Sequence, residues 1–264
     1  MRGVEVPAQL LTIYLLLHLR FVGMIFSSSL FVSTMSPASF RYLFTVLLTA
    51  ASVGTLAQVD VPLFLFENLF SMAFAALREL LIGLVLGFLS SLPLVALRIA
   101  GEQVGTVMGL SMAQVVDPMT QSQDSLVGQL NFLVGMWFYF HWNGHLLMVR
   151  AMIETLRFVP LGGLSIFPHG DVAVGTWLQG LFILAMRIVI PFYCALMLAD
   201  IGLGFLARTV PQMNIFVLGL PVKVALGLTV LAVVLPLTVD LIFTQLERWI
   251  EFAMGGVLFW HSVF

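Results

Sequence analysis

Long, almost uncharged stretches constrain the fold of this chain more than any other feature of its sequence. Of its 264 residues, 61% are hydrophobic and 9% are charged, whereas about a quarter of the residues of soluble domains are charged. A helix of about 20 apolar residues crosses a bilayer's hydrocarbon core of roughly 30 Å. Six blocks approach or exceed this length: Ala8–Phe31, Phe40–Ala57, Leu69–Leu97, Leu126–Met148, Val174–Leu198 and Ile215–Leu237. The pattern predicts an all-α integral membrane protein with six long apolar helical blocks.

The two ends of this pattern carry further predictions. No small-residue cleavage motif stands clearly before Pro37, so we expect Ala8–Phe31 to be a retained helix rather than a signal peptide. At the other end, the seventh apolar element, Leu241–Phe264, has charged and apolar residues on opposite helical sides. This pattern predicts a C-terminal amphipathic helix that lies at an interface or on a partner.

Two arginines do not suit a simple protein with six spans. Arg20 lies in the first apolar block and Arg187 lies midway through the fifth. A charge at that depth is costly in lipid and normally faces protein or water. The arginines of the connecting segments also give no clear positive-inside orientation. We therefore expect much of the surface of this chain to meet other proteins.

A polar break after the third block is the most distinctive local feature. Gly101, Gly105 and Gly109 are spaced by four residues, which on a helix makes a stripe without side chains where another backbone can approach. Gly83 and Gly87 are further candidates for helix packing. The pattern then ends at Asp117-Pro118, and such a break must be buried in protein or line an aqueous cavity. An ordinary interhelical loop with a small-residue packing face is the alternative.

Composition argues against several classes of function. The net charge of −2 and the single lysine, Lys223, argue against a nucleic-acid partner. No catalytic constellation or cofactor motif is evident, so we expect neither an enzyme nor a cofactor. His141 and His145 share a helical face but lack carboxylate or thiolate neighbours, so an aromatic belt is favoured over a metal site. The lone Cys194 excludes an intrachain disulfide and, between apolar neighbours, is expected to be buried.

Three segments resemble the FliR family of flagellar biosynthetic proteins: Ala100–Pro118, Asn143–Gly163 and Ile201–Gly227. The third segment carries the most specific pattern, Pro-Gln-x-Asn-x-Phe-x-x-Gly-x-Pro-x-Lys. Its fixed residues here are Pro211, Gln212, Asn214, Phe216, Gly219, Pro221 and Lys223. The motifs occur in the family's order and with its spacing across nearly the whole chain.

The resemblance implies a subunit of the type III protein export gate in the bacterial inner membrane, at the flagellar basal body. In that family, one such subunit assembles with several copies of FliP and FliQ into a helical channel, near FlhB and FlhA. Unfolded flagellar proteins pass through it. By the same resemblance, residues 1–173 form a FliP-like helical portion and residues 174–264 a FliQ-like helical hairpin.

The resemblance also implies that the segment near residues 108–118 is a plug that projects into the channel. The residues that would form it are Met108, Gly109, Leu110, Met112, Val115 and Val116. Family members often carry phenylalanine at the positions of Met112 and Val115. Both replacements here are apolar, so the sequence retains the chemistry of a seal but not its aromatic character.

Two other functions are the alternatives. A homologous export-gate subunit of a virulence injectisome shares the same resemblance, although Asn143–His145 and Gly219–Lys223 favour the flagellar branch. From another class, a small-solute secondary transporter also uses broken helices at its binding site. No inverted internal repeat supports the transporter, and the intrahelical arginines have no evident paired partners in the sequence. Export is therefore the favoured function.

Overall fold

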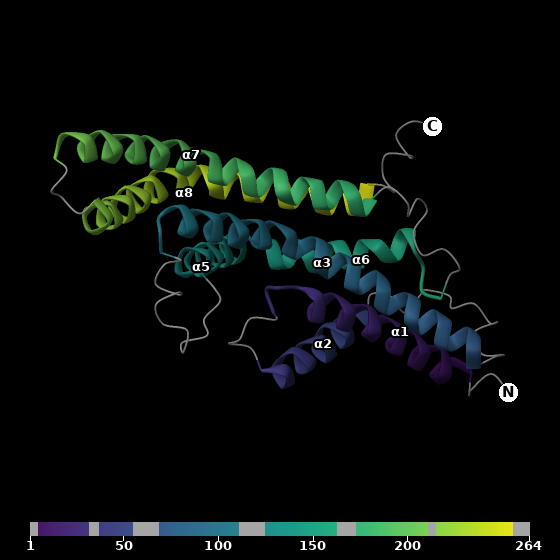
Figure 1. The fold of residues 1–264 in the computed structure, drawn as a ribbon. Helices are drawn as coiled ribbons and strands as arrows, with labels where there is room; N and C mark the ends of the chain where they lie inside the picture. Colours follow the sequence, from purple (N-terminus) through teal and green to yellow (C-terminus); the bar gives the residue numbers. More distant parts are fainter. Residues whose placement is uncertain are drawn as a thin grey trace. The chain divides into compact units, whose positions relative to one another are not determined.

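The computed structural model of the chain describes residues 5–31, 37–54, 69–110, 125–162, 173–210 and 215–255. Within these ranges the chain forms helices and no strands, which confirms the all-α prediction (Figure 1). The helices are α1 (Glu5–Ser27), α2 (Ala38–Val53), α3 (Leu69–Val107), α5 (Leu126–His141), α6 (Gly144–Phe158), α7 (Ala173–Thr209) and α8 (Ile215–Gly255).

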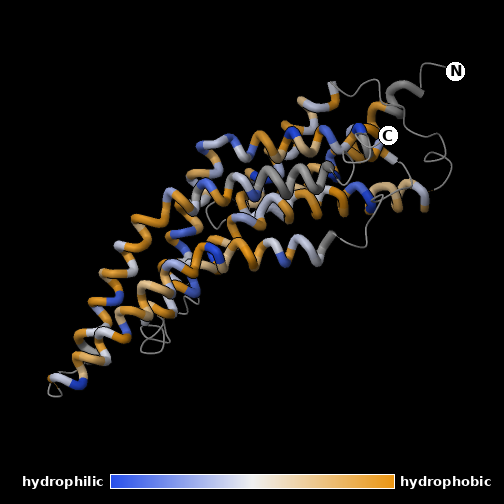
Figure 2. Tube along the Cα trace, turned by 90° about the horizontal axis from the view of Figure 1, so that it is seen from above, coloured by the Kyte–Doolittle hydropathy of each residue, from blue (hydrophilic) through white to orange (hydrophobic). Residues whose placement is uncertain are grey.

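Four of these helices, α1, α3, α7 and α8, are long and apolar enough to cross a membrane. Figure 2 shows hydrophobic residues along the greater part of the helical trace. The six predicted blocks do not all become such helices. Phe40–Ala57 yields only the 16-residue helix α2, and Leu126–Met148 is divided between α5 and α6.

The division of Leu126–Met148 has a local cause. Asn143 has a φ of 58°, a left-handed conformation that asparagine tolerates better than most residues with a Cβ atom. Helix α5 therefore ends at His141, and α6 begins at Gly144. The Asn143-Gly144 dipeptide, a common turn signal, thus marks a break that interrupts the predicted block.

The C-terminal element is not a separate helix. Helix α8 runs without interruption from Ile215 to Gly255, although Pro221 and Pro236 lie inside it. No glycine or proline stands between Leu237 and Leu241 to end it. The structure therefore joins the sixth block to most of the predicted amphipathic helix. The side chains that would form the polar and apolar sides of this amphipathic helix lie outside the part of the chain whose side chains the structure describes.

The chain divides into two compact units. Unit 1 comprises Met1–Leu92, Asn143–Trp177 and Leu246–Phe264, and unit 2 comprises Pro93–Trp142 and Leu178–Gln245. Helices α3, α7 and α8 contribute to both, and in α3 the boundary falls at Pro93. Each unit thus draws on both sides of the predicted division at residue 173/174. That division into FliP-like and FliQ-like parts stays a prediction.

In unit 1, α1 packs against α2 and against the first half of α3. Leu17, Phe21 and Met24 of α1 are completely buried, and His18 Nδ1 lies 3.2 Å from Thr49 Oγ1 of α2. Between α1 and α3 the backbones themselves come close. A Cβ atom built on Gly83 would press on the carbonyl oxygen of Arg20. Small residues thus permit a closer approach than larger side chains would.

In unit 2, the second half of α3 packs on α5 through small residues. A Cβ atom on Gly101 would lie 2.7 Å from the Cα atom of Gly128. One turn further, a Cβ atom on Gly105 would collide with the hydroxyl of Ser125. The buried side of α7 supplies Ile188 and other apolar residues to the core of the same unit.

Candidate functional sites

The end of α3 is the part of the predicted plug that the structure describes. Gly109 has a φ of +82°. Its amide donates to the Thr106 carbonyl at 3.0 Å, and the Leu110 amide donates to the Gly105 carbonyl at 3.0 Å. These two bonds form a Schellman motif, which ends a helix at a glycine in the left-handed conformation. Gly109 therefore lies beyond the helix that carries Gly101 and Gly105, where it turns the chain.

Met108 is seated against α8. Its side chain is 1% exposed, and a Cβ atom built on Gly227 would lie 2.6 Å from its Cε atom. One residue on, a Cβ atom on Gly109 would lie 3.2 Å from Leu220 of the same helix. These contacts fix the position from which the following segment leaves the helix. Met112, Val115 and Val116 lie outside the described residues.

The family-motif hairpin is described in part. Pro211, Gln212 and Asn214 lie outside the described residues, as does the side chain of Phe216. Among the other three, Gly219 is buried beside Leu203 and Pro221 is exposed.

Lys223 has a partner that the sequence does not reveal. Its Nζ atom lies 2.5 Å from Asp200 Oδ1, and this pair joins α8 to α7. The two residues are 23 positions apart on opposite arms of the hairpin, so no local spacing links them.

A buried ionic cluster in unit 1 satisfies Arg20. Arg20 Nε donates to Glu79 Oε2 at 2.5 Å, and both side chains are completely buried. Its other two nitrogens donate to Thr155 Oγ1 and to the Val159 carbonyl, each at 3.1 Å. The expectation that Arg20 faces protein or water agrees with this cluster, but the protein is this chain itself, so Arg20 does not call for another protein. The sequence-based view that the arginines lack paired partners was wrong for this one.

Glu79 connects further parts of unit 1. Its second oxygen accepts a hydrogen bond from the Gly162 amide at 3.3 Å and lies 3.8 Å from Arg78 Nη2. The same Arg78 nitrogen donates to the Pro160 carbonyl at 3.1 Å. The cluster thus ties α1 and α3 to the turn after α6. Charges inside an apolar block signal such a cluster, but they do not identify its members.

Arg187 and Cys194 are exposed on α7. The expectation that Cys194 is buried was therefore wrong. Its flanking residues are apolar, but on a helix the neighbours in sequence point in other directions, so they do not report on its burial.

No metal-binding constellation forms in the described part of the chain, where no three His, Cys, Asp or Glu side chains gather. His141 is exposed and stacks on Trp137, with ring centroids 5.3 Å apart. This contact agrees with an aromatic cluster at the end of α5. It offers no ligand set for a metal ion.

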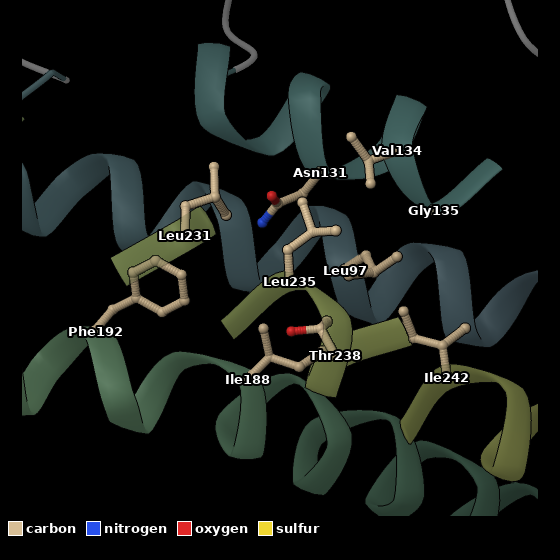
Figure 3. A pocket seen from close by; sticks show the side chains of 10 residues that line it. All are labelled: Leu97, Asn131, Val134, Gly135, Ile188, Phe192, Leu231, Leu235, Thr238 and Ile242. Carbon is tan, nitrogen blue, oxygen red and sulfur yellow. The ribbon is translucent and has the colours of Figure 1, made fainter. Parts of the chain in front are cut away.

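A small cavity lies in unit 2 (Figure 3). Its volume of about 20 Å³ accommodates about one water molecule. The lining is apolar apart from Asn131 on α5 and Thr238 on α8. This space is far too small for a substrate of the size that ligand pockets hold, hundreds of cubic ångströms.

The described residues therefore define a class: a membrane-embedded helical protein with an internal ionic cluster and long helices whose apolar faces remain exposed. Within that class, the chain belongs to the bacterial export proteins, family 1, whose pattern matches residues 11–249. It is a FliR-type component of a type III export apparatus.

Relatives agree with this assignment. The flagellar biosynthetic protein FliR of Bacillus subtilis strain 168 is 32% identical over 227 residues, 83% of this chain and 85% of the relative. FliR of Escherichia coli strain K12 is 28% identical over 227 residues, 86% of this chain and 85% of the relative. The Yop proteins translocation protein T of Yersinia pestis is 30% identical over 161 residues, 59% of this chain and 60% of the relative.

Proposed function

We propose that this chain is one subunit of a protein-export channel built with several copies of FliP and FliQ. The channel lies in the inner membrane at the flagellar basal body, with FlhB and FlhA nearby, and passes unfolded flagellar proteins. Its FliR relatives support the flagellar assignment. The surface of α7 supports the need for partners.

The observation that carries this proposal is the length of the exposed apolar face of α7. Large apolar side chains are exposed from Leu178 to Leu206. At 1.5 Å per residue these positions span about 42 Å, whereas the hydrocarbon core measures roughly 30 Å. On a helix that runs along the membrane normal, lipid tails therefore cannot cover the whole face at once. Other proteins must bury the remainder.

The segment at residues 108–118 is proposed as the seal of the channel. Met108 anchors its start against α8, and Gly109 turns the chain out of α3. Leu110, Met112, Val115 and Val116 would present an apolar surface to the channel. A narrow apolar constriction excludes water and ions by dewetting, because water is not stabilised there.

Deleting the gene tests the export assignment. We expect non-motile cells that lack hook and filament, because the exported subunits stay inside. A plasmid copy should restore motility. Normal filaments in the deletion strain would contradict the flagellar proposal.

The similarity to the Yersinia protein supports an injectisome as the second candidate. If the chain belongs to an injectisome, deleting the gene should stop secretion of virulence proteins and leave the filaments intact. The same strain therefore distinguishes the two systems.

The seal is tested by replacing Met112 and Val115 together with serine. We expect the FliP–FliQ–FliR-type complex to assemble while the membrane leaks, which slows growth and admits normally excluded small solutes. A matched control replaces the exposed apolar residues Leu69 and Phe70 with serine. Loss of the complex itself would assign the segment to packing. Normal assembly with a tight membrane would contradict the seal at these two residues.

A further inference from the structure

One helical face of α7 combines exposed apolar side chains with a single cation. We call it the Arg187 face and define it by six residues: Ile183, Arg187, Ile190, Cys194, Met197 and Ile201. Their spacings of three and four residues place them on one side of the helix. All six are exposed. Arg187 therefore carries a charge on a surface that is otherwise apolar.

The described part of the chain supplies no counterion for Arg187. No ion pair or hydrogen bond joins its side chain to another described residue. The nearest acid on its own helix is Asp200, 13 positions away or about 20 Å along the axis. Asp200 is already paired with Lys223 at 2.5 Å. Arg20, by contrast, has its own buried carboxylate.

Lipid alone cannot cover the Arg187 face favourably, whether Arg187 lies within the hydrocarbon core or at the membrane boundary. If the hydrocarbon core covers the helix around Arg187, the charge lies where it is costly. If Arg187 stands at the membrane boundary, apolar residues on one side must leave the membrane. These include Ile183 of the Arg187 face, which is 45% exposed, and the adjacent Phe182 and Met186, which are 59% and 52% exposed. Both placements require a protein to cover one part of the face.

We propose that the Arg187 face docks an apolar helix of another membrane protein, and that this helix carries an aspartate or glutamate facing Arg187. The proposal rests on the proposed function, in which the partner is another subunit of the export channel. An apolar helix covers the exposed side chains, while the carboxylate compensates the one charge that the fold leaves open. Such a pair sets the register of the two helices as well as their choice of partner.

Cross-linking identifies the occupant. A photo-reactive amino acid is placed at Ile183 or at Ile190, one turn to either side of Arg187, in cells that express the full apparatus. We expect adducts with an apolar helical segment of another protein that contains an Asp or Glu. Adducts with lipid only, or with a second copy of this chain, would overturn the proposal.

Charge variants test the ion pair itself. Arg187→Glu should reduce the amount of complex recovered from membranes by about tenfold or more, because it places two acids together inside an interface. Arg187→Lys should retain most of the complex. Changing the cross-linked carboxylate to lysine should restore assembly and motility to Arg187→Glu. Arg157→Leu is the control, since Arg157 is an exposed arginine of α6 in the other unit.

The outcomes separate this inference from the proposed function. The inference fails if Arg187→Leu assembles and swims like the wild type, or if no carboxylate variant restores Arg187→Glu. Either result leaves the export function standing, provided that the deletion strain lacks filaments. A deletion strain with normal filaments would instead contradict the export function, whatever the behaviour of the arginine variants.

Discussion

Unit 1 and unit 2 stabilise their helices by different means. Unit 1 buries charge: Arg20 and Glu79 lie together in its interior and bind the turn after α6. Both units also pack helices through small residues, and in unit 2 these contacts are Gly101 against Gly128 and Met108 against Gly227. Unit 2 also leaves Arg187 exposed. Unit 1 therefore satisfies its buried Arg20 within the chain, whereas unit 2 leaves Arg187 for a partner.

Two of the close contacts, one in each unit, differ in kind. In unit 1, Gly83 faces the backbone of α1, which cannot move without displacing the helix. In unit 2, Gly227 faces the end of the Met108 side chain. Methionine is unbranched and can adopt another rotamer. We therefore expect the Gly83 contact to tolerate added atoms less well than the Gly227 contact.

The largest expected effect follows from removing the buried carboxylate. Glu79→Leu leaves Arg20 and Arg78 buried without their anion, so we expect a loss of about 3–5 kcal/mol in the free energy of unfolding. Thermal unfolding of the purified complex in detergent measures it. The double variant Arg20→Met with Glu79→Leu should lose less, because only Arg78, and no longer Arg20, is then left buried without its anion.

The control for this variant is Glu154→Ala. Glu154 pairs with Arg150 one turn away on the surface of α6, and the Arg150 side chain is 76% exposed. Such exposed pairs contribute only about 0.3–0.5 kcal/mol. If Glu79→Leu cost no more than Glu154→Ala, the buried cluster would not be what stabilises unit 1.

A smaller effect is expected where two backbones touch. Gly83→Ala adds a Cβ atom against the carbonyl of Arg20, so α1 and α3 must separate locally. Overpacking of this kind costs about 1–3 kcal/mol. Thermal unfolding of the same complex measures it. Gly175→Ala on α7 is the matched control, because its added Cβ atom meets nothing within 4 Å and it lies in unit 1, before the exposed face that begins at Leu178. The control should be neutral, or stabilising by up to about 1 kcal/mol.

The smallest effect is expected at the contact between Gly227 and Met108. Gly227→Ala places a Cβ atom against the flexible end of the methionine, which can shift. The gain in helix propensity also offsets part of the strain. We expect a net change below about 1 kcal/mol in the same unfolding measurement. A cost equal to that of Gly83→Ala would remove the contrast between the two contacts.

Several features could be predicted from the sequence because they depend on local chemistry. The apolar blocks indicate helices, and Asn143-Gly144 indicates the break between α5 and α6. The need of Arg20 for a partner also follows from its apolar neighbours. The boundaries of the helices were less predictable, since α8 continues through positions where the hydropathy pattern changes. A helix ends where a cap or breaker stops it, not where its surroundings change from apolar to amphipathic.

Sequence patterns alone identify this chain as an all-α membrane protein of the export family. They also show that two of its arginines stand in apolar surroundings. Whether each arginine has a partner within the chain becomes clear only from the tertiary structure. Arg20 finds Glu79, 59 positions away, because the glycine contacts bring α1 and α3 together at that level. Arg187 finds no such acid in the described ranges, because the fold turns its face outward. Helical periodicity groups residues on one face, but the packing of helices far apart in sequence determines what that face meets.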